Sequence, residues 1–208
     1  MGRILALTDG VFAFAMTLLV LSLTVPTLPL SGYTPLQISG HLGHALWQDY
    51  GAFAGYVFVF VMISNWWIAH HRLFRFIVRY DEVLVVLNLL LLLEIAVMPF
   101  VLKVFVSYDD TQIAVILFSL IQIATALTLG GLWRYASHDH RLILKDTPDV
   151  ILRYFGARTA VTPVIFAISI AVSFVDVTAA EFLWIAIFGL RYAIGVFFTR
   201  RGEPDPAP

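Results

Sequence analysis

Ionisable side chains interrupt stretches of sequence that are otherwise apolar, and these are the side chains that could take part in chemistry. Asp9, Glu94 and Arg191 each lie within such a stretch. A charge in the middle of a membrane-spanning helix costs about 2.5–3.5 kcal/mol on insertion scales, so it marks a functional group or a compensated pair. Glu94 and Arg191 are expected at the same depth, which predicts a buried ion pair that staples two helices. A proton relay through Glu94 is the alternative.

A second polar group joins the first apolar stretch to the end of the second. Counted from the ends of these stretches, Asp9 and the segment 67–71 lie at similar depth. We therefore expect an interhelical network in which Trp67 or His70 bonds to Asp9 and Arg3 adds a charge-assisted bond. A staple with no part in transport is an equally simple interpretation of the same residues.

The elements that must position these residues are membrane-spanning helices. The chain has 208 residues, of which 60% are hydrophobic and 13% charged, against about 25% charged in soluble proteins. Segments with the roughly 20 apolar residues needed to span a bilayer run over 4–25, 50–71, 83–105, 112–134, 157–175 and 180–199. The first is too long for a signal-peptide core and contains a charge, so we expect it to be retained.

The predicted fold class is therefore all-α, a polytopic membrane protein with six transmembrane helices. We expect one domain over 1–199 and a disordered cytoplasmic tail over 200–208, because the tail is polar and rich in proline. The first loop starts irregular after Pro26, and its second half, 36–47, is predicted to form a short interfacial helix.

The distribution of basic residues predicts the orientation. Cytoplasmic loops of membrane proteins carry an excess of Lys and Arg. With both termini in the cytoplasm, only Lys103 falls near the outer face, and the chain is expected in the cell membrane. The basic residues that then lie on the cytoplasmic side are Arg3, Arg72, Arg75, Arg79, Arg134, Arg141, Lys145, Arg153, Arg158, Arg200 and Arg201.

Several classes of function are excluded. The chain has no cysteine, so thiol catalysis and Cys-ligated metals are ruled out. The adjacent His70 and His71 point about 100° apart on a helix, so no metal or other cofactor is predicted. A net charge of -1 without a basic run argues against nucleic acid. The sequence also lacks a GxxxxGK[ST] loop, a GxSxG elbow and a TVGYG filter, so no enzyme is predicted.

One face of the first helix carries a continuous stripe. Phe14, Thr17, Leu18, Leu21 and Val25 recur at spacings of three and four residues. Most such stripes pack against neighbouring helices. The alternative is a pore wall, since apolar rings can gate or select ions by forcing dehydration. The spacing alone leaves both interpretations open.

The start of the chain resembles a known family. Residues 3–10 read RILALTDG, close to the RxxxFSDG signature of the transmembrane-protein-175 potassium channels, the endosomal and lysosomal channels and their prokaryotic relatives. The end of the second span, with Trp67, His70 and His71, is similar to that family as well. The resemblance covers nearly the whole chain, although the later spans are generic.

The resemblance implies a homotetramer in which the first helix lines a central pore. By position, the constriction falls on Phe14, the next pore-facing layers on Leu18 and Leu21, and a polar layer on Thr17. It also implies that the interhelical network comprises Arg3, Asp9, Trp67 and His70. The constriction position is usually Ile or Leu in that family, whereas here it is Phe14.

The function expected on these grounds is a potassium-permeable cation channel with a hydrophobic constriction on the first helix in place of a carbonyl filter. Its partners would be membrane lipid, further copies of the chain and potassium ions. A proton-coupled membrane transporter and a non-conducting membrane scaffold remain as alternatives.

Overall fold

The computed structural model describes residues 2–28, 31–108 and 110–200. Its long helices are α1 (Gly2–Leu18), α2 (Pro35–Gln48), α3 (Tyr50–Phe74), α4 (Glu82–Ser107), α5 (Gln112–Ser137), α6 (Asp149–Ser173) and α8 (Ala186–Arg200). Short pieces are η1 (Leu19–Ser22), η2 (His138–His140), α7 (Val177–Phe182) and η3 (Leu183–Ile185). Within these described ranges, six helical segments are long and apolar enough to cross a membrane, which confirms the predicted number of spans.

Several boundaries differ by a few residues from those predicted by hydropathy, and the ends of the first span and of α6 show why. α6 begins at Asp149 and not at residue 157, because Asp149 lies in the first turn, where a carboxylate complements the helix dipole. The first span ends at Ser22 and not at residue 25, because its last turn narrows to η1 and Leu23 is already extended. At the other end of the chain, Arg200 closes α8, while the rest of the predicted tail, with Arg201, lies outside the described residues.

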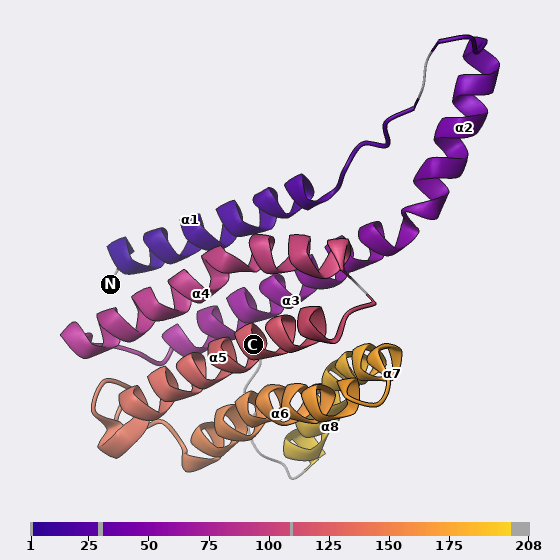
Figure 1. Cartoon of the computed structure of the whole chain (residues 1–208). Helices are drawn as coiled ribbons and strands as arrows, with labels where there is room; N and C mark the ends of the chain where they lie inside the picture. Colours follow the sequence, from indigo (N-terminus) through magenta and orange to yellow (C-terminus); the bar gives the residue numbers. More distant parts are fainter. Residues whose placement is uncertain (1, 29–30, 109, 201–208) are drawn as a thin grey trace.

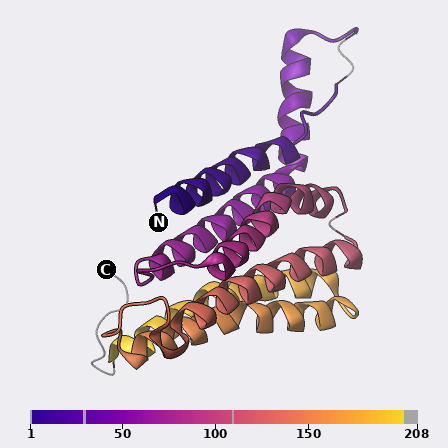
Figure 2. The same cartoon turned by 90° about the vertical axis from the view of Figure 1, so that its left-hand side faces the viewer.

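The predicted helix in the first loop is present as α2. Thr34 and Gln37 form a reciprocal capping box at its start, and Pro35 occupies the first turn, a pattern that satisfies orphan backbone N–H groups. All of α2 lies among the described residues, and none of its side chains is buried. Figures 1 and 2 show it projecting beyond the bundle.

The spanning helices form a bundle with α1 at one edge (Figures 1 and 2). α1 packs against α4 and α3, whereas α5 packs extensively on both α4 and α6. The core between these helices is aromatic: the rings of Phe118 and Trp184 lie 4.6 Å apart, and Phe166 and Phe105 pack against them. α1 therefore lies against the bundle on one side only.

Two connecting loops join at the end of the bundle where α3 ends and α5 ends. An isolated antiparallel bridge pairs Ile77 with Ile143. Beside it, the Tyr135 hydroxyl donates to Oδ2 of Asp81 over 2.6 Å, and the Arg141 guanidinium lies 3.6 Å from the same oxygen. Because α1, α4 and α6 also begin at this end, most of the predicted cytoplasmic arginines gather there (Figure 1).

Candidate functional site

The two faces of α1 differ in what they contact. Thr8, Phe12 and Ala15 are buried against the bundle. On the opposite side the Phe14 side chain is 65% exposed and that of Leu21 is 69% exposed, and Thr17 is exposed between them. Leu18, at the edge of this stripe, is partly buried. We call Phe14 and Thr17 on α1, together with Leu21 on the η1 turn that continues it, the free stripe of α1.

The hydroxyl of Thr17 has a defined orientation within the free stripe. It donates a hydrogen bond to the backbone carbonyl of Phe14, 2.8 Å away. A hydroxyl carries one donor and two acceptor lone pairs, so this bond uses the proton and leaves the oxygen as an acceptor on the exposed side of the helix.

The buried face of α1 is held by a chain of hydrogen bonds through three helices. The Asn88 amide nitrogen donates to Oγ1 of Thr8 over 3.0 Å, and Nε2 of His70 lies 2.9 Å from Oδ1 of Asn88. An amide oxygen only accepts, so His70 carries its proton on Nε2 in this arrangement. All three side chains are buried, and the His70 ring stacks on Phe74 at 4.0 Å. This series of hydrogen bonds ties α1 to α4 and α4 to α3.

Asp9 makes the second polar link of α1. The Trp67 indole nitrogen donates to Oδ1 of Asp9 over 2.8 Å, and the indole stacks on the ring of His71 at 5.6 Å. The structure thus brings Asp9 and Trp67 together, whereas His70 bonds to Asn88 and not to Asp9. Asp9 is exposed, so its carboxylate lies outside the buried face of α1.

The structure does not join Arg3 to this group. Among the described residues, Arg3 is exposed and makes neither a hydrogen bond nor an ion pair with Asp9. The physical reason is helix geometry, since residues six apart point about 120° away from each other. The predicted charge-assisted bond between Arg3 and Asp9 is therefore not formed.

The predicted ion pair between Glu94 and Arg191 is also corrected. Glu94 accepts a hydrogen bond from the Thr128 hydroxyl over 2.7 Å, on the α4–α5 interface. Arg191 instead lies over the indole ring of Trp66, 5.5 Å from its centroid. The position of Glu94 and Arg191 along their helices correctly predicted that both are buried. It does not reveal the direction in which each side chain points, and the two point into different helix interfaces.

The polar contacts of Gln122 and Thr8 were not predicted from the sequence. Gln122 accepts a hydrogen bond from the Trp66 indole over 2.9 Å in the bundle core, and Thr8 forms the α1 end of the buried chain. A signal existed for both, since each is a polar residue inside a long apolar run. No group of three or more His, Cys, Asp or Glu residues able to hold a metal occurs in the described part of the chain.

Comparison with known proteins defines the class of fold. A crystal structure of a lysosomal potassium-selective channel TMEM175 homolog from Chamaesiphon minutus is similar, with a TM-score of 0.75 and 25% identity over 94% of this chain and 96% of that one. A potassium channel of Streptomyces collinus is 31% identical over 84% of this chain and 83% of its own length. A potassium channel of Chamaesiphon minutus is 29% identical over 97% and 95%.

The family model for the endosomal/lysosomal potassium channel TMEM175 matches residues 3–99, which hold α1 and both of its polar links. The chain belongs to the TMEM175 family. This is a family of ion channels and not of enzymes, in agreement with the sequence analysis.

Proposed function

We propose that the chain forms a homotetrameric, potassium-permeable cation channel whose pore is lined by the free stripe of α1. The observation that carries this proposal is the position of α1: it lies at the edge of the bundle and leaves Phe14, Thr17 and Leu21 uncovered. Similar chains named as potassium channels in two bacteria support the permeant ion.

The free stripe suits an ion path without a carbonyl filter. Four Phe14 side chains around an axis would form an apolar constriction at which an ion sheds part of its water. Aromatic faces attract cations by about 0.5–2 kcal/mol, which offsets part of that loss. The Thr17 oxygen, left free to accept by its bond to Phe14, supplies a ligand one turn along the helix.

The orientation follows from the basic residues. The end of the bundle where α1 begins and α3 ends carries Arg3, Arg72 and Arg75. We therefore assign this end, with both termini, to the cytoplasmic side of the cell membrane. In this orientation Asp9 lies toward the cytoplasmic entrance of the proposed pore.

The test is cation flux into liposomes that contain purified protein, with potassium, sodium and a large organic cation compared. Phe14→Ala is expected to change the rate or the selectivity of potassium flux. Phe100→Ala is the matched control, because Phe100 is a similarly exposed phenylalanine, at 64%, that belongs to α4 and not to the free stripe. Equal effects of the two substitutions would contradict the pore assignment.

The same measurement separates the alternatives. Absence of potassium flux from folded, assembled wild-type protein would favour a scaffold. Flux that requires a proton gradient would favour a transporter.

A further inference from the structure

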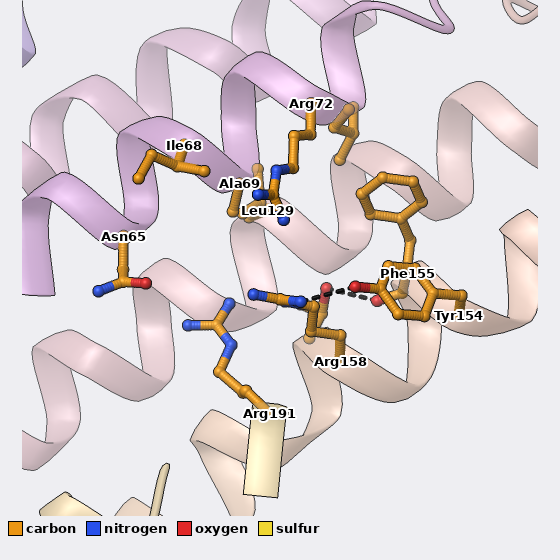
Figure 3. A pocket seen from close by; sticks show the side chains of 11 residues that line it. Asn65, Ile68, Ala69, Arg72, Leu129, Tyr154, Phe155, Arg158 and Arg191 are labelled. Atoms are coloured by element: carbon orange, nitrogen blue, oxygen red, sulfur yellow. Dashed lines mark hydrogen bonds between the residues drawn. The ribbon is translucent and has the colours of Figure 1, made fainter. Parts of the chain in front are cut away.

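Three arginines from three different helices meet in one cavity near the arginine-rich end of the bundle. Figure 3 shows the side chains of Arg72 on α3, Arg158 on α6 and Arg191 on α8 turned toward one another. Tyr154 and Asn65 also line this cavity, which we call the arginine pocket. Its volume is about 20 Å³, enough for roughly one water molecule.

Arg191 is the most deeply placed of the three. Its side chain is 6% exposed, and its Nε has no hydrogen-bond partner within the described part of the chain. The face of Trp66 gives partial compensation through a cation–π contact at 5.5 Å, but that contact does not satisfy a buried N–H donor. A guanidinium with an unused donor thus points into the arginine pocket.

The neighbours of Arg191 increase the excess of positive charge. The other charged residues that line the arginine pocket are Arg158 and Arg72, both cations. Arg158 donates from Nη1 to the Tyr154 hydroxyl over 2.6 Å, a neutral partner. No acidic residue is among the described residues that line the pocket. Like charges inside a membrane-spanning bundle are costly unless an opposite charge joins them.

We propose that the arginine pocket is a binding site for a phosphate group, carried by an anionic lipid headgroup or free in solution. Planar guanidinium groups match phosphate oxygens with two parallel hydrogen bonds. Basic pockets between transmembrane helices near the cytoplasmic face are suited to lipid headgroups. Since the cavity itself is small, the phosphate lies at its mouth, where Arg72 and Arg158 are half-buried, and directs one oxygen toward Arg191.

The site is distinct from the proposed pore, but α3 connects the two. Arg72 lies in the last turn of α3, close in sequence to Trp67 and His70, which make the two polar links to α1 and α4. The arginine pocket and the free stripe nevertheless share no residue. The binding test is therefore independent of whether the free stripe conducts ions.

The test is the melting temperature of the purified full chain in detergent at constant ionic strength. The probes are short-chain phosphatidylglycerol, inorganic phosphate and short-chain phosphatidylcholine as the zwitterionic control. A ligand at 100 times its Kd stabilises a folded protein enough to raise the melting temperature by about 5–10 °C. We expect such a shift in wild type with phosphatidylglycerol, phosphate or both, and its loss in Arg72→Gln, Arg158→Gln and Arg191→Gln.

Arg153→Gln is the matched control, because Arg153 lies on α6 near the same end but is exposed and does not line the pocket. A shift with phosphatidylglycerol alone assigns the site to a lipid headgroup, and a shift with both probes assigns it to phosphate in general. If Arg191→Gln fails to fold, Arg72→Gln and Arg158→Gln decide. The proposal is overturned if phosphatidylcholine gives the same shift, if neither anion shifts wild type, or if the pocket variants keep the wild-type shift.

Discussion

The indole N–H of Trp67 donates a hydrogen bond of 2.8 Å to the carboxylate of Asp9, and this bond ties the exposed flank of α1 to α3. Its strength can be measured with a double-mutant cycle of Asp9→Ala and Trp67→Phe. Interhelical hydrogen bonds in membrane proteins average about 0.6 kcal/mol and reach about 1.7. Because one partner here is charged, we expect a coupling free energy near the upper value, measured by reversible unfolding in mixed detergent.

A control cycle pairs Asp9→Ala with Trp133→Phe. The Trp133 indole donates to the Leu152 carbonyl, far from α1 in the chain's fold, so this pair should be additive. Additive effects in the Asp9–Trp67 cycle as well would mean that the bond does not stabilise the bundle.

The buried chain from Thr8 through Asn88 to His70 should behave as a unit. Asn88→Leu removes both hydrogen bonds of Asn88 and leaves a buried donor on His70 and a buried hydroxyl on Thr8. Unsatisfied buried groups cost about 1–3 kcal/mol each, so the two groups together should lower the unfolding free energy by roughly 2–6 kcal/mol.

The triple variant Thr8→Val, Asn88→Leu and His70→Phe tests the cause of that loss. It replaces all three polar groups with apolar ones of similar shape, so no donor remains unsatisfied, and we expect it to be more stable than Asn88→Leu alone. A triple variant at least as unstable as the single one would show that packing, and not hydrogen bonding, sets the cost.

The sequence was sufficient for the number and type of the membrane-spanning segments. Each span is a long apolar run, and a bilayer leaves helices as the simplest structure for such runs. The exact ends were less predictable, because charged residues such as Asp149 and Arg153 extend α6 beyond its apolar part. A hydropathy scale does not detect helical turns made of polar residues, such as those that precede the apolar part of α6.

The partners of the buried polar residues were harder to predict than their burial. Glu94 and Arg191 were recognised as costly, yet each found a partner on a different helix, Thr128 and Trp66. Depth along a span is readable from sequence, whereas rotation of one helix against its neighbours depends on packing across the whole bundle. The same limit explains why the sequence leaves Trp67 and His70 as alternative hydrogen-bond partners of Asp9, of which Trp67 makes the bond.

Asp81 predicts a pH dependence at the end of the bundle, outside the spans. The hydrogen bond from Tyr135, the backbone N–H of Leu84 and the nearby Arg141 hold the pKa of this carboxyl below its usual range. A lowered folded-state pKa stabilises the protein above the ordinary pKa of about 4, and this stabilisation is lost as the pH falls through the folded-state value.

The measurement compares melting temperatures of wild type and Asp81→Asn at pH 7 and pH 3. The variant should melt lower at pH 7, and the difference should shrink at pH 3, which lies below the ordinary pKa, because there the carboxyl takes up a proton when the chain unfolds. Asp146→Asn is the control, because Asp146 is exposed in the nearby loop. A difference that does not change with pH would show that the charge of Asp81 is not what stabilises this end.

The Thr17 hydroxyl is expected to contribute to ion flux. This prediction rests on the proposed pore. Thr17→Val keeps the shape of the side chain but removes the oxygen that the bond to Phe14 leaves free to accept. We expect a several-fold lower potassium flux, since one lost ligand bond of about 1 kcal/mol corresponds to a roughly five-fold change in rate. Thr17→Ser should keep most of the flux because it keeps the hydroxyl.

Thr125→Val is the matched control for Thr17. The Thr125 hydroxyl also bonds to a backbone carbonyl of its own helix, that of Ile121, but it is buried within the bundle. Its loss should leave flux unchanged. If Thr17→Val conducts like wild type, the hydroxyl is not an ion ligand and the constriction acts through its apolar side chains alone.

Glu94 distinguishes a channel from a proton-coupled transporter. Oε1 of Glu94 accepts from Thr128, while Oε2 is buried without a hydrogen-bond partner among the described residues. Glu94→Gln keeps the acceptor for Thr128 and removes the titratable group, so a channel lined by α1 should conduct potassium at the wild-type rate. A transporter that uses Glu94 as its relay would lose flux driven by a proton gradient. Glu94→Ala serves as the stability control, because it leaves the Thr128 hydroxyl unsatisfied and should lower the unfolding free energy by about 1–3 kcal/mol.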